Sequence, residues 1–417
     1  MTGPPRSLGD VSVPAASPPM DPARIIRARI AASLLFLTNG AIFSNLLPRL
    51  PEIKDMFELS NAMYGLAVIA FPIGGVVAGP LPAPILRRFG TARTAAVGSV
   101  LLATAVFVAG SVPVLAVFGA GLFLAGMLDA VVDTAQNAQG LRVQRLAGTS
   151  MINSMHALWS VGAVIGGLMG TGAAALHVPF VWHFLTSAVL FAAVAVLAMR
   201  WAVPDDPDSH AAAQAESVPL DTAGLPRLPR GTGAALLALL PIAVIAMSGV
   251  LVEDVGSNWS AVYLRDVLSA PVGMVGLGYV SLVGAQFVGR LLGDRLIDAM
   301  GAVLVTRIGG VLILVGLGAV ALAPAPWVAL GGFALAGFGC ATMVPNAYAA
   351  ADRAPGLKPG TGLTLVSWCM RIVFVISPPL VGLFADAVGL RTALFVFPFM
   401  GVLAFLFAGA LRVRGRS

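Results

Sequence analysis

The sequence predicts an all-α membrane protein of twelve transmembrane helices. Apolar residues make up 58% of the 417 residues and charged residues only 11%, whereas a soluble domain carries about 25% charged residues. Twelve apolar runs follow residue 27, and each has the length of about 20 residues that a spanning helix needs. About 20 of the 25 lysines and arginines fall on one side when these runs are threaded through a bilayer in order. Because cytoplasmic loops retain basic residues, we expect an inner (plasma) membrane protein with both termini in the cytoplasm.

The elements follow in a simple order. Residues 1–26, rich in Pro, Ser and Gly, are predicted to form a disordered cytoplasmic tail. Six spans then form an N-terminal bundle over 27–201, and six more form a C-terminal bundle over 233–412. The long polar break between them, 202–232, is predicted to be a cytoplasmic linker. The predicted spans are 27–48, 62–86, 94–112, 114–141, 151–175, 178–201, 233–257, 270–293, 304–324, 326–350, 362–384 and 388–411.

A shift of 211 residues brings the two halves into register. It places Gly90, after the second span, on Gly301, after the eighth, and it places Gly126 in the fourth span on Gly337 in the tenth. One offset that aligns two separated landmarks favours a duplicated six-helix unit. Parallel repeats related by an axis along the membrane normal are the organisation of one large transporter fold.

Several short motifs resemble the major facilitator superfamily. After the second span, Ala83-Pro84-Ile85-Leu86-Arg87-Arg88-Phe89-Gly90 keeps the glycine and a basic residue of its Gly-x-x-x-Asp-(Arg/Lys)-x-Gly-(Arg/Lys) signature, with Arg87 in place of the aspartate. Further motifs are similar to its fucose-permease-like branch and relatives of unassigned substrate: Leu50-Pro51-Glu52-Ile53-Lys54, Asp133-x-x-Gln136-Asn137-x-Gln139-Gly140, His156-Ala157-Leu158-Trp159-Ser160 and Glu253…Trp259-Ser260-x-x-Tyr263-Leu264. The resemblance covers residues 27–412. It implies two pseudo-symmetric six-helix bundles (the major facilitator fold) that move a solute by alternating access.

Four acidic residues lie well inside predicted spans, and we expect them to couple transport to protons: Asp129, Asp133, Glu253 and Asp254. A charge at the bilayer centre costs about 2.5–3.5 kcal/mol on insertion scales, so these side chains should avoid lipid. Asp129, Asp133, Gln136 and Asn137 also follow one stripe of a helix, at i, i+4, i+7 and i+8. Burial away from water favours the protonated form of a carboxyl group, as a proton carrier requires. The alternative is that the stripe only joins helices through hydrogen bonds, at about 0.6–2 kcal/mol each.

Other polar and aromatic residues within the spans are candidates for binding a solute. Arg371, the only basic residue in mid-span, cannot lose its proton and therefore needs an anion, from either a protein acid or the solute. Tryptophan can stack on a sugar ring or simply fill the core. The full candidate set is Asn39, Asn45, Gln136, Asn137, His156, Trp159, Trp259, Tyr263, Gln286, Asn346, Trp368 and Arg371. Arg290 and Asp294 lie four residues apart on one helix, and we expect a local ion pair between them.

The sequence carries no motif for an enzyme, a cofactor or a metal. No nucleotide-binding Gly-Lys-Ser/Thr loop is present, and two cysteines and four histidines lack metal-ligand spacing. The basic residues form no stripe that would indicate nucleic acid. We therefore expect a monomeric transporter whose partners are a small-molecule solute, protons and the lipid bilayer, with a polar, sugar-like solute implied by the resemblance. The alternatives are proton-driven efflux of amphipathic compounds and a membrane sensor that has lost transport.

Overall fold

The computed structural model describes residues 21–149, 151–203, 233–354, 357 and 360–412. Every regular element in these ranges is a helix, so the all-α prediction is confirmed for this part of the chain. Most of the predicted tail (1–26) and of the predicted linker (202–232) lies outside the described residues.

The first bundle contains α1 to α9. Its elements are α1 (Pro22–Ser44), η1 (Leu47–Arg49), α2 (Leu50–Met56), α3 (Asn61–Val68), α4 (Ala70–Val77), α5 (Pro82–Phe89), α6 (Thr91–Ser111), α7 (Leu115–Ala147), α8 (Ile152–Ala175) and α9 (Phe180–Met199). The second bundle runs from α11 to η4. Its elements are α11 (Gly233–Asp254), η2 (Val255–Trp259), α12 (Ser260–Val262), η3 (Tyr263–Val267), α13 (Val272–Val275), α14 (Leu277–Ala321), α15 (Pro326–Cys340), α16 (Met343–Asp352), α17 (Thr361–Val388), α18 (Leu390–Leu394), α19 (Pro398–Phe407) and η4 (Ala408–Leu411).

Ten helical segments of the described chain are long and apolar enough to cross a membrane. An eleventh span is a bent pair, Asn61–Val77 and Pro82–Phe89, whose axes meet at 62° where the sequence predicted one continuous run over 62–86. The second helix of the pair begins at Pro82, which has no N–H group to continue the helical hydrogen bonds of the preceding segment.

The twelfth span is contained in α14. This helix counts 45 residues, about twice what a bilayer needs, and Gly301 inside it has the non-helical angles φ 79° and ψ 152°. A positive φ is readily adopted only by glycine, so the chain is interrupted there and α14 serves as two spans, close to the predicted 270–293 and 304–324. With this division the described residues hold twelve spans, as predicted.

The two bundles repeat the same local geometry at the offset of 211 residues. Gly90 has φ 82° and ψ 162°, close to the angles of Gly301. Gly126 has no room for a Cβ against the carbonyl oxygen of Phe71, and Gly337 has none against that of Leu282. Phe71 and Leu282 are themselves 211 residues apart, so the offset relates a pair of helix contacts as well as two glycines.

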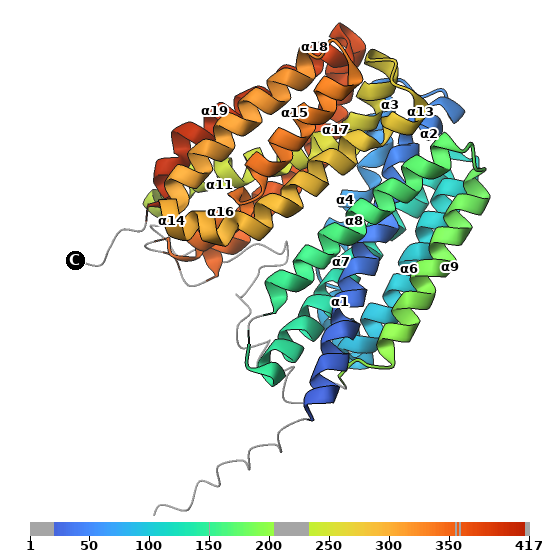
Figure 1. Ribbon diagram of the computed structural model, residues 1–417, viewed down its shortest axis with the longest axis vertical. Helices are drawn as coiled ribbons and strands as arrows, with labels where there is room; N and C mark the ends of the chain where they lie inside the picture. Colours follow the sequence, from blue (N-terminus) through green and yellow to red (C-terminus); the bar gives the residue numbers. More distant parts are fainter. Residues whose placement is uncertain (1–20, 150, 204–232, 355–356, 358–359, 413–417) are drawn as a thin grey trace, which may run out of the picture.

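The two bundles lie side by side and meet closely at one end, near α2, α3, α13 and α18 (Figure 1). There Arg265 donates two hydrogen bonds to the Asp55 carboxylate, at 2.7 and 2.9 Å. Asp386 of α17 accepts the backbone N–H groups of Asn61 and Ala62 at 2.9 Å each, in the first turn of α3. We call this the closed end; the opposite end is where α9 stops and α11 starts.

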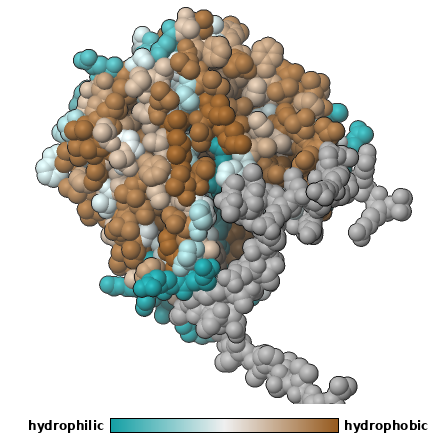
Figure 2. Space-filling model, turned by 180° about the vertical axis from the view of Figure 1, so that it is seen from behind, coloured by the Kyte–Doolittle hydropathy of each residue, from teal (hydrophilic) through white to brown (hydrophobic). Residues whose placement is uncertain are grey.

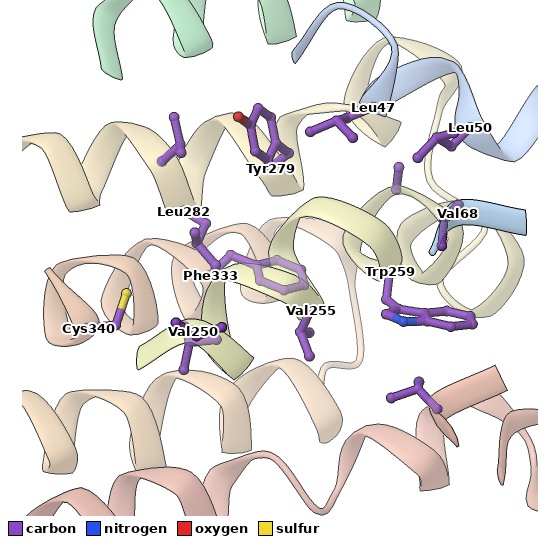
Figure 3. Packing of buried hydrophobic residues seen from close by; sticks show 14 of the residues in the cluster. Leu47, Leu50, Val68, Val250, Val255, Trp259, Tyr279, Leu282, Phe333 and Cys340 are labelled. Atoms are coloured by element: carbon purple, nitrogen blue, oxygen red, sulfur yellow. The ribbon is translucent and has the colours of Figure 1, made fainter. Parts of the chain in front are cut away.

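Apolar side chains from both bundles form one continuous cluster beneath the closed end. Leu47, Leu50 and Val68 of the first bundle and Tyr279 and Trp259 of the second belong to this cluster (Figure 3). Trp259 is fully buried and packs edge-on against Tyr64 of α3, with ring centroids 5.2 Å apart. The cluster therefore excludes water from the junction at this end of the molecule.

The outer surface of the bundles is largely apolar. On the face that Figure 2 shows, brown hydrophobic residues cover most of the described surface, and hydrophilic residues lie mainly at its two ends and along the seam between the lobes. Trp182, Trp201 and Trp327 are exposed near the ends of their helices. This is the distribution that a lipid-facing surface with interfacial tryptophans requires.

Candidate functional site

Asn39 of α1 is the centre of a polar network inside the first bundle. Its side-chain amide donates to the Asp129 carboxylate of α7 at 2.8 Å, and its oxygen accepts the Trp159 indole N–H of α8 at 2.8 Å. The Gln136 amide reaches the same Asn39 oxygen at 3.5 Å. One buried asparagine thus links the three helices that carry the predicted polar residues of this bundle.

The network continues along α7 to its exposed member, Asp133. The Asp133 carboxylate accepts hydrogen bonds from the side-chain amides of Gln136, at 3.3 Å, and of Asn137, at 3.0 Å. Asn137 in turn shares a 3.1 Å hydrogen bond with the imidazole of His156 on α8. Seven predicted site residues therefore form one connected set, which we call the first-bundle network: Asn39, Asp129, Asp133, Gln136, Asn137, His156 and Trp159.

Close packing of α1 against α8 positions this network. Gly162 and Gly166 of α8 have no room for a Cβ against the carbonyl oxygens of Leu37 and Ala41, and Gly40 of α1 has none against that of Trp159. Small residues at such positions let two helix backbones approach, which brings short side chains within hydrogen-bonding distance. The direct Asn39–Trp159 contact depends on that approach.

A second cluster lies in the other bundle, centred on Glu253 of α11. Its carboxylate accepts hydrogen bonds from the Gln286 amide and from the Arg290 guanidinium, the latter at 3.1 Å. The other terminal nitrogen of Arg290 lies 3.5 Å from the Ser160 hydroxyl of α8. Because Ser160 belongs to the first bundle, Arg290 connects the Glu253 cluster to that bundle across the junction.

The expected ion pair between Arg290 and Asp294 is wrong. Asp294 is exposed, whereas Arg290 pairs with Glu253, whose side chain is only 28% exposed. A carboxylate removed from water lacks competing hydration, so it is the stronger partner for the guanidinium. Helical spacing shows that Asp294 is within reach of Arg290 but not that a carboxylate on another helix is nearer.

We predict that Glu253→Gln lowers stability because it leaves Arg290 without its anion. The pair is partly exposed, at 33% and 28%, so the loss should lie between values for surface and fully buried pairs, at roughly 1–3 kcal/mol. Thermal melting in detergent measures it. The matched control is Asp294→Asn, which should change the melting temperature little; equal effects of the two variants would contradict this assignment.

Three charged or ionisable side chains are exposed at the junction between the bundles, in a region that we call the cleft. Asp133, His156 and Arg371 are exposed although each lies within a long apolar helix, on α7, α8 and α17 respectively. Electrostatic interactions cross from one bundle to the other, between Asp133 and Arg371 and between His156 and Arg290. These exposed side chains therefore act on one another across the junction between the bundles.

The structure places the remaining predicted residues away from this cleft or beside it. Asp254 is fully buried and accepts hydrogen bonds from Ser377 and Asn258 inside the second bundle. Asn45 bonds to the Ala41 carbonyl and to His183. Tyr263 donates to the Val320 carbonyl, Asn346 to Thr306, and Trp259 packs in the apolar junction. Trp368 is half-buried on α17, three residues before Arg371.

Sequence reasoning missed Ser160 and Tyr348. Ser160 contacts Arg290 at 3.5 Å, and Tyr348 of α16 interacts electrostatically with Arg371. Ser160 lies one helical turn after His156, a spacing that could have marked it as a neighbour of the network. Tyr348 lies two residues after Asn346 in an alanine-rich stretch, where no repeating polar pattern singles it out.

The second bundle also contains a groove whose lining, unlike that of the cleft, is entirely apolar. It has a volume of about 710 Å³ and lies between α14 and α15, where it is lined by Ala285, Leu312, Ala319, Val328, Gly331, Gly332, Ala334, Leu335 and Phe338. None of these side chains offers a charged or hydrogen-bonding group. We therefore locate the candidate site in the polar cleft and not in this groove.

Comparisons with known proteins point to one family. The sequence model of the Major Facilitator Superfamily matches residues 32–296 and 254–417. The Uncharacterized transporter y4wD of Sinorhizobium fredii (strain NBRC 101917 / NGR234) is 26% identical over 379 residues, which cover 90% of this chain and 96% of that protein. The Membrane protein MosC of Rhizobium meliloti is 25% identical over 382 residues, covering 89% and 87% respectively.

Solved structures with the same fold cover nearly the whole chain. The nucleoside transporter NupG is similar with a TM-score of 0.69 at 14% identity, over 94% of this chain and all of that one. A D-xylose–proton symporter gives 0.69 at 16% identity, over 92% and 97%. FucP in its outward conformation gives 0.57 at 18% identity, over 94% and 100%.

Proposed function

This chain belongs to the major facilitator superfamily, and from that membership we propose that it moves a small polar solute by proton symport through the cleft between its bundles. The family prediction is confirmed, and the protein is a multi-pass membrane transporter rather than an enzyme. The identity of the solute class and the coupling to protons are our proposals.

The observation that carries the proposal is the first-bundle network. Seven polar side chains from α1, α7 and α8 are connected by hydrogen bonds, and two of them, Asp133 and His156, are exposed to the cleft. Ionisable groups inside a membrane-spanning bundle are costly and mark the paths of substrates and protons. A network that only joined helices would have no reason to expose a carboxylate.

We assign the proton to Asp133, with Asp129 as the deeper member of the same stripe. Asp133 is open to the cleft, so it can exchange protons with water, and Asn137 connects it to His156. Asp129 is less exposed and is held by Asn39. Closing the cleft removes water from Asp133 and favours its protonated form, which is how an alternating bundle can carry a proton.

The lining of the cleft supports a polar solute. Asn137 and Trp159 are partly exposed beside Asp133, whereas Asn39 and Gln136 are buried. The side-chain amide of Asn137 offers a hydrogen-bond donor and an acceptor to hydroxyl groups, and the Trp159 ring offers an apolar face. Proteins of the same fold include a nucleoside transporter and a D-xylose–proton symporter, which agree with this class of solute. Efflux of amphipathic compounds would instead favour a large apolar cleft.

The basic loops imply that the closed end faces outward and that the cleft opens to the cytoplasm. We predict that Arg200→Cys, at the end of α9, reacts only with reagents applied from the cytoplasm, because that end carries most of the basic charge. Glu58→Cys, exposed at the closed end, should react only from outside. Both variants need Cys340 and Cys369 replaced by alanine; labelling from the reverse sides would contradict this orientation.

Uptake into proteoliposomes tests the proposed function. Purified protein in vesicles with an alkaline interior should accumulate one or more members of a polar solute mixture, detected by mass spectrometry. A protonophore should abolish that accumulation. Uptake equal to that of protein-free vesicles for every solute would reject transport of this class, and uptake indifferent to the protonophore would reject the coupling.

A further inference from the structure

Arg371 is a cation near the middle of α17 that has no hydrogen-bond or ion-pair partner among the described residues. It is the eleventh residue of the helix Thr361–Val388 and is exposed, whereas the adjacent Met370 is buried. No hydrogen bond or ion pair joins its guanidinium to another described residue. Its electrostatic interactions are with Asp133 across the cleft and with Tyr348 on α16.

Hydrogen-bond donors already satisfy the acids near the cleft. Glu253 is paired with Arg290, and Asp129 is held by Asn39. Asp254 is turned into the second bundle towards Ser377. Asp133 is the remaining acid that acts on Arg371, and in the proposed function it carries the proton and is then neutral. In the loaded state, therefore, none of these acids supplies an anion to Arg371.

A guanidinium has five N–H groups in a planar fork and does not deprotonate. That fork matches the two oxygens of a carboxylate or phosphate group. An open cleft hydrates Arg371, but a cleft that closes around a solute removes this water. The cation then requires an anion in the same closed space.

We infer that the transported solute carries an oxyanion, a carboxylate or a phosphate group, which binds Arg371 while its hydroxyl-bearing part contacts the first-bundle network. This inference rests on the proposed function, because it assumes that a solute occupies the cleft. It narrows the proposed class of solute from polar compounds to polar compounds that carry an acidic group. Arg371 is thereby a specificity-determining residue.

Matched pairs of solutes test this inference in proteoliposomes with an alkaline interior. The mixture contains D-glucuronate with D-glucose, D-galacturonate with D-galactose, D-gluconate with D-glucitol, and D-glucose 6-phosphate as the phosphate arm. We expect at least one acidic member to accumulate at least tenfold more than its neutral partner. Accumulation of the sugar phosphate alone would identify phosphate rather than carboxylate as the recognised group.

Substitution of Arg371 supplies the second readout. Arg371→Gln should weaken the apparent affinity for the accumulated acid by roughly a hundredfold, the loss expected for a bidentate charge-assisted contact, and Arg371→Lys should weaken it less. Arg353→Gln, an exposed arginine at the end of α16, is the control and should behave like the wild type. Melting temperatures show whether each variant is folded.

The possible outcomes distinguish failure of this inference from failure of the proposed function. Accumulation of neutral members only, or an Arg371→Gln variant that accumulates the acid as the wild type does, overturns the inference and leaves the proposed function standing. The absence of any protein-dependent accumulation overturns the proposed function and this inference with it.

Discussion

Asp133→Asn should abolish accumulation of the solute against its gradient while leaving exchange of solute across the membrane in place. Asparagine has the shape of aspartate and retains an oxygen that can accept the hydrogen bonds from Gln136 and Asn137. It cannot carry a proton. A pH difference of about two units supplies about 2.7 kcal/mol per proton, enough for roughly a hundredfold accumulation, and the variant should reduce that ratio to about one.

Counterflow between labelled and unlabelled solute measures the exchange that should remain. The control is Thr134→Val, because Thr134 is adjacent on α7 but its hydroxyl bonds only to the carbonyl of Ala130. If Asp133 served only to neutralise Arg371, its loss would strand a cation, lower the melting temperature and impair both activities together. Normal accumulation by Asp133→Asn under a pH gradient would show that the proton is carried elsewhere.

Gly65→Ala should shift the protein away from the conformation described above and strongly reduce transport. A Cβ at Gly65 of α3 would collide with the carbonyl group of Pro378 on α17, which is backbone and cannot turn aside. Overpacking of this kind costs roughly 1–3 kcal/mol, which changes the ratio of two states by roughly 5- to 150-fold. Because α3 contacts α17 only while the closed end is shut, the substitution should raise the free energy of this conformation alone.

A cysteine placed in the closed end should detect this change of conformation through its labelling rate. Ser44 is 3% exposed and its hydroxyl is 2.8 Å from that of Tyr279 in the other bundle, so Ser44→Cys should be protected in the closed end. Adding Gly65→Ala should speed its labelling by at least roughly fivefold. Gly119→Ala is the matched control, since nothing lies within 4 Å of an added Cβ there. Equal labelling rates in the two backgrounds would argue against a gate at the closed end.

The sequence was sufficient to predict the spans and the polar stripe of α7. Both depend on local chemistry: a bilayer requires runs of about 20 apolar residues, and a carboxylate on a spanning helix avoids lipid. Asp129, Asp133, Gln136 and Asn137 lie on one face of an unbroken helix, so their spacing of 3.6 residues per turn placed them together correctly.

The same reasoning did not locate partners on other helices. Periodicity identifies the face of a helix but not what lies opposite, which is why the pairing of Arg290 with Glu253 was missed. Glu253 and Asp254 are adjacent, yet successive residues on a helix point about 100° apart, so one faces Arg290 and the other Ser377.

A change of helix type after Asp254 explains why Trp259 and Tyr263 are buried in the apolar core. Residues Val255–Trp259 and Tyr263–Val267 form π-helical turns, which hold more residues per turn than an α-helix. The interior face therefore rotates relative to an α-helical projection. Trp259 and Tyr263 consequently turn into the apolar core, where nothing in the residue spacing had placed them.

Proton movement driven by the solute tests the central claim most directly. Vesicles containing the protein and a trapped pH-sensitive dye are prepared without a pH gradient, and the solute that accumulates in the uptake assay is added outside. Symport through Asp133 predicts that the lumen acidifies on addition and that Asp133→Asn vesicles show no such change. Solute entry without acidification in the wild type would contradict the account.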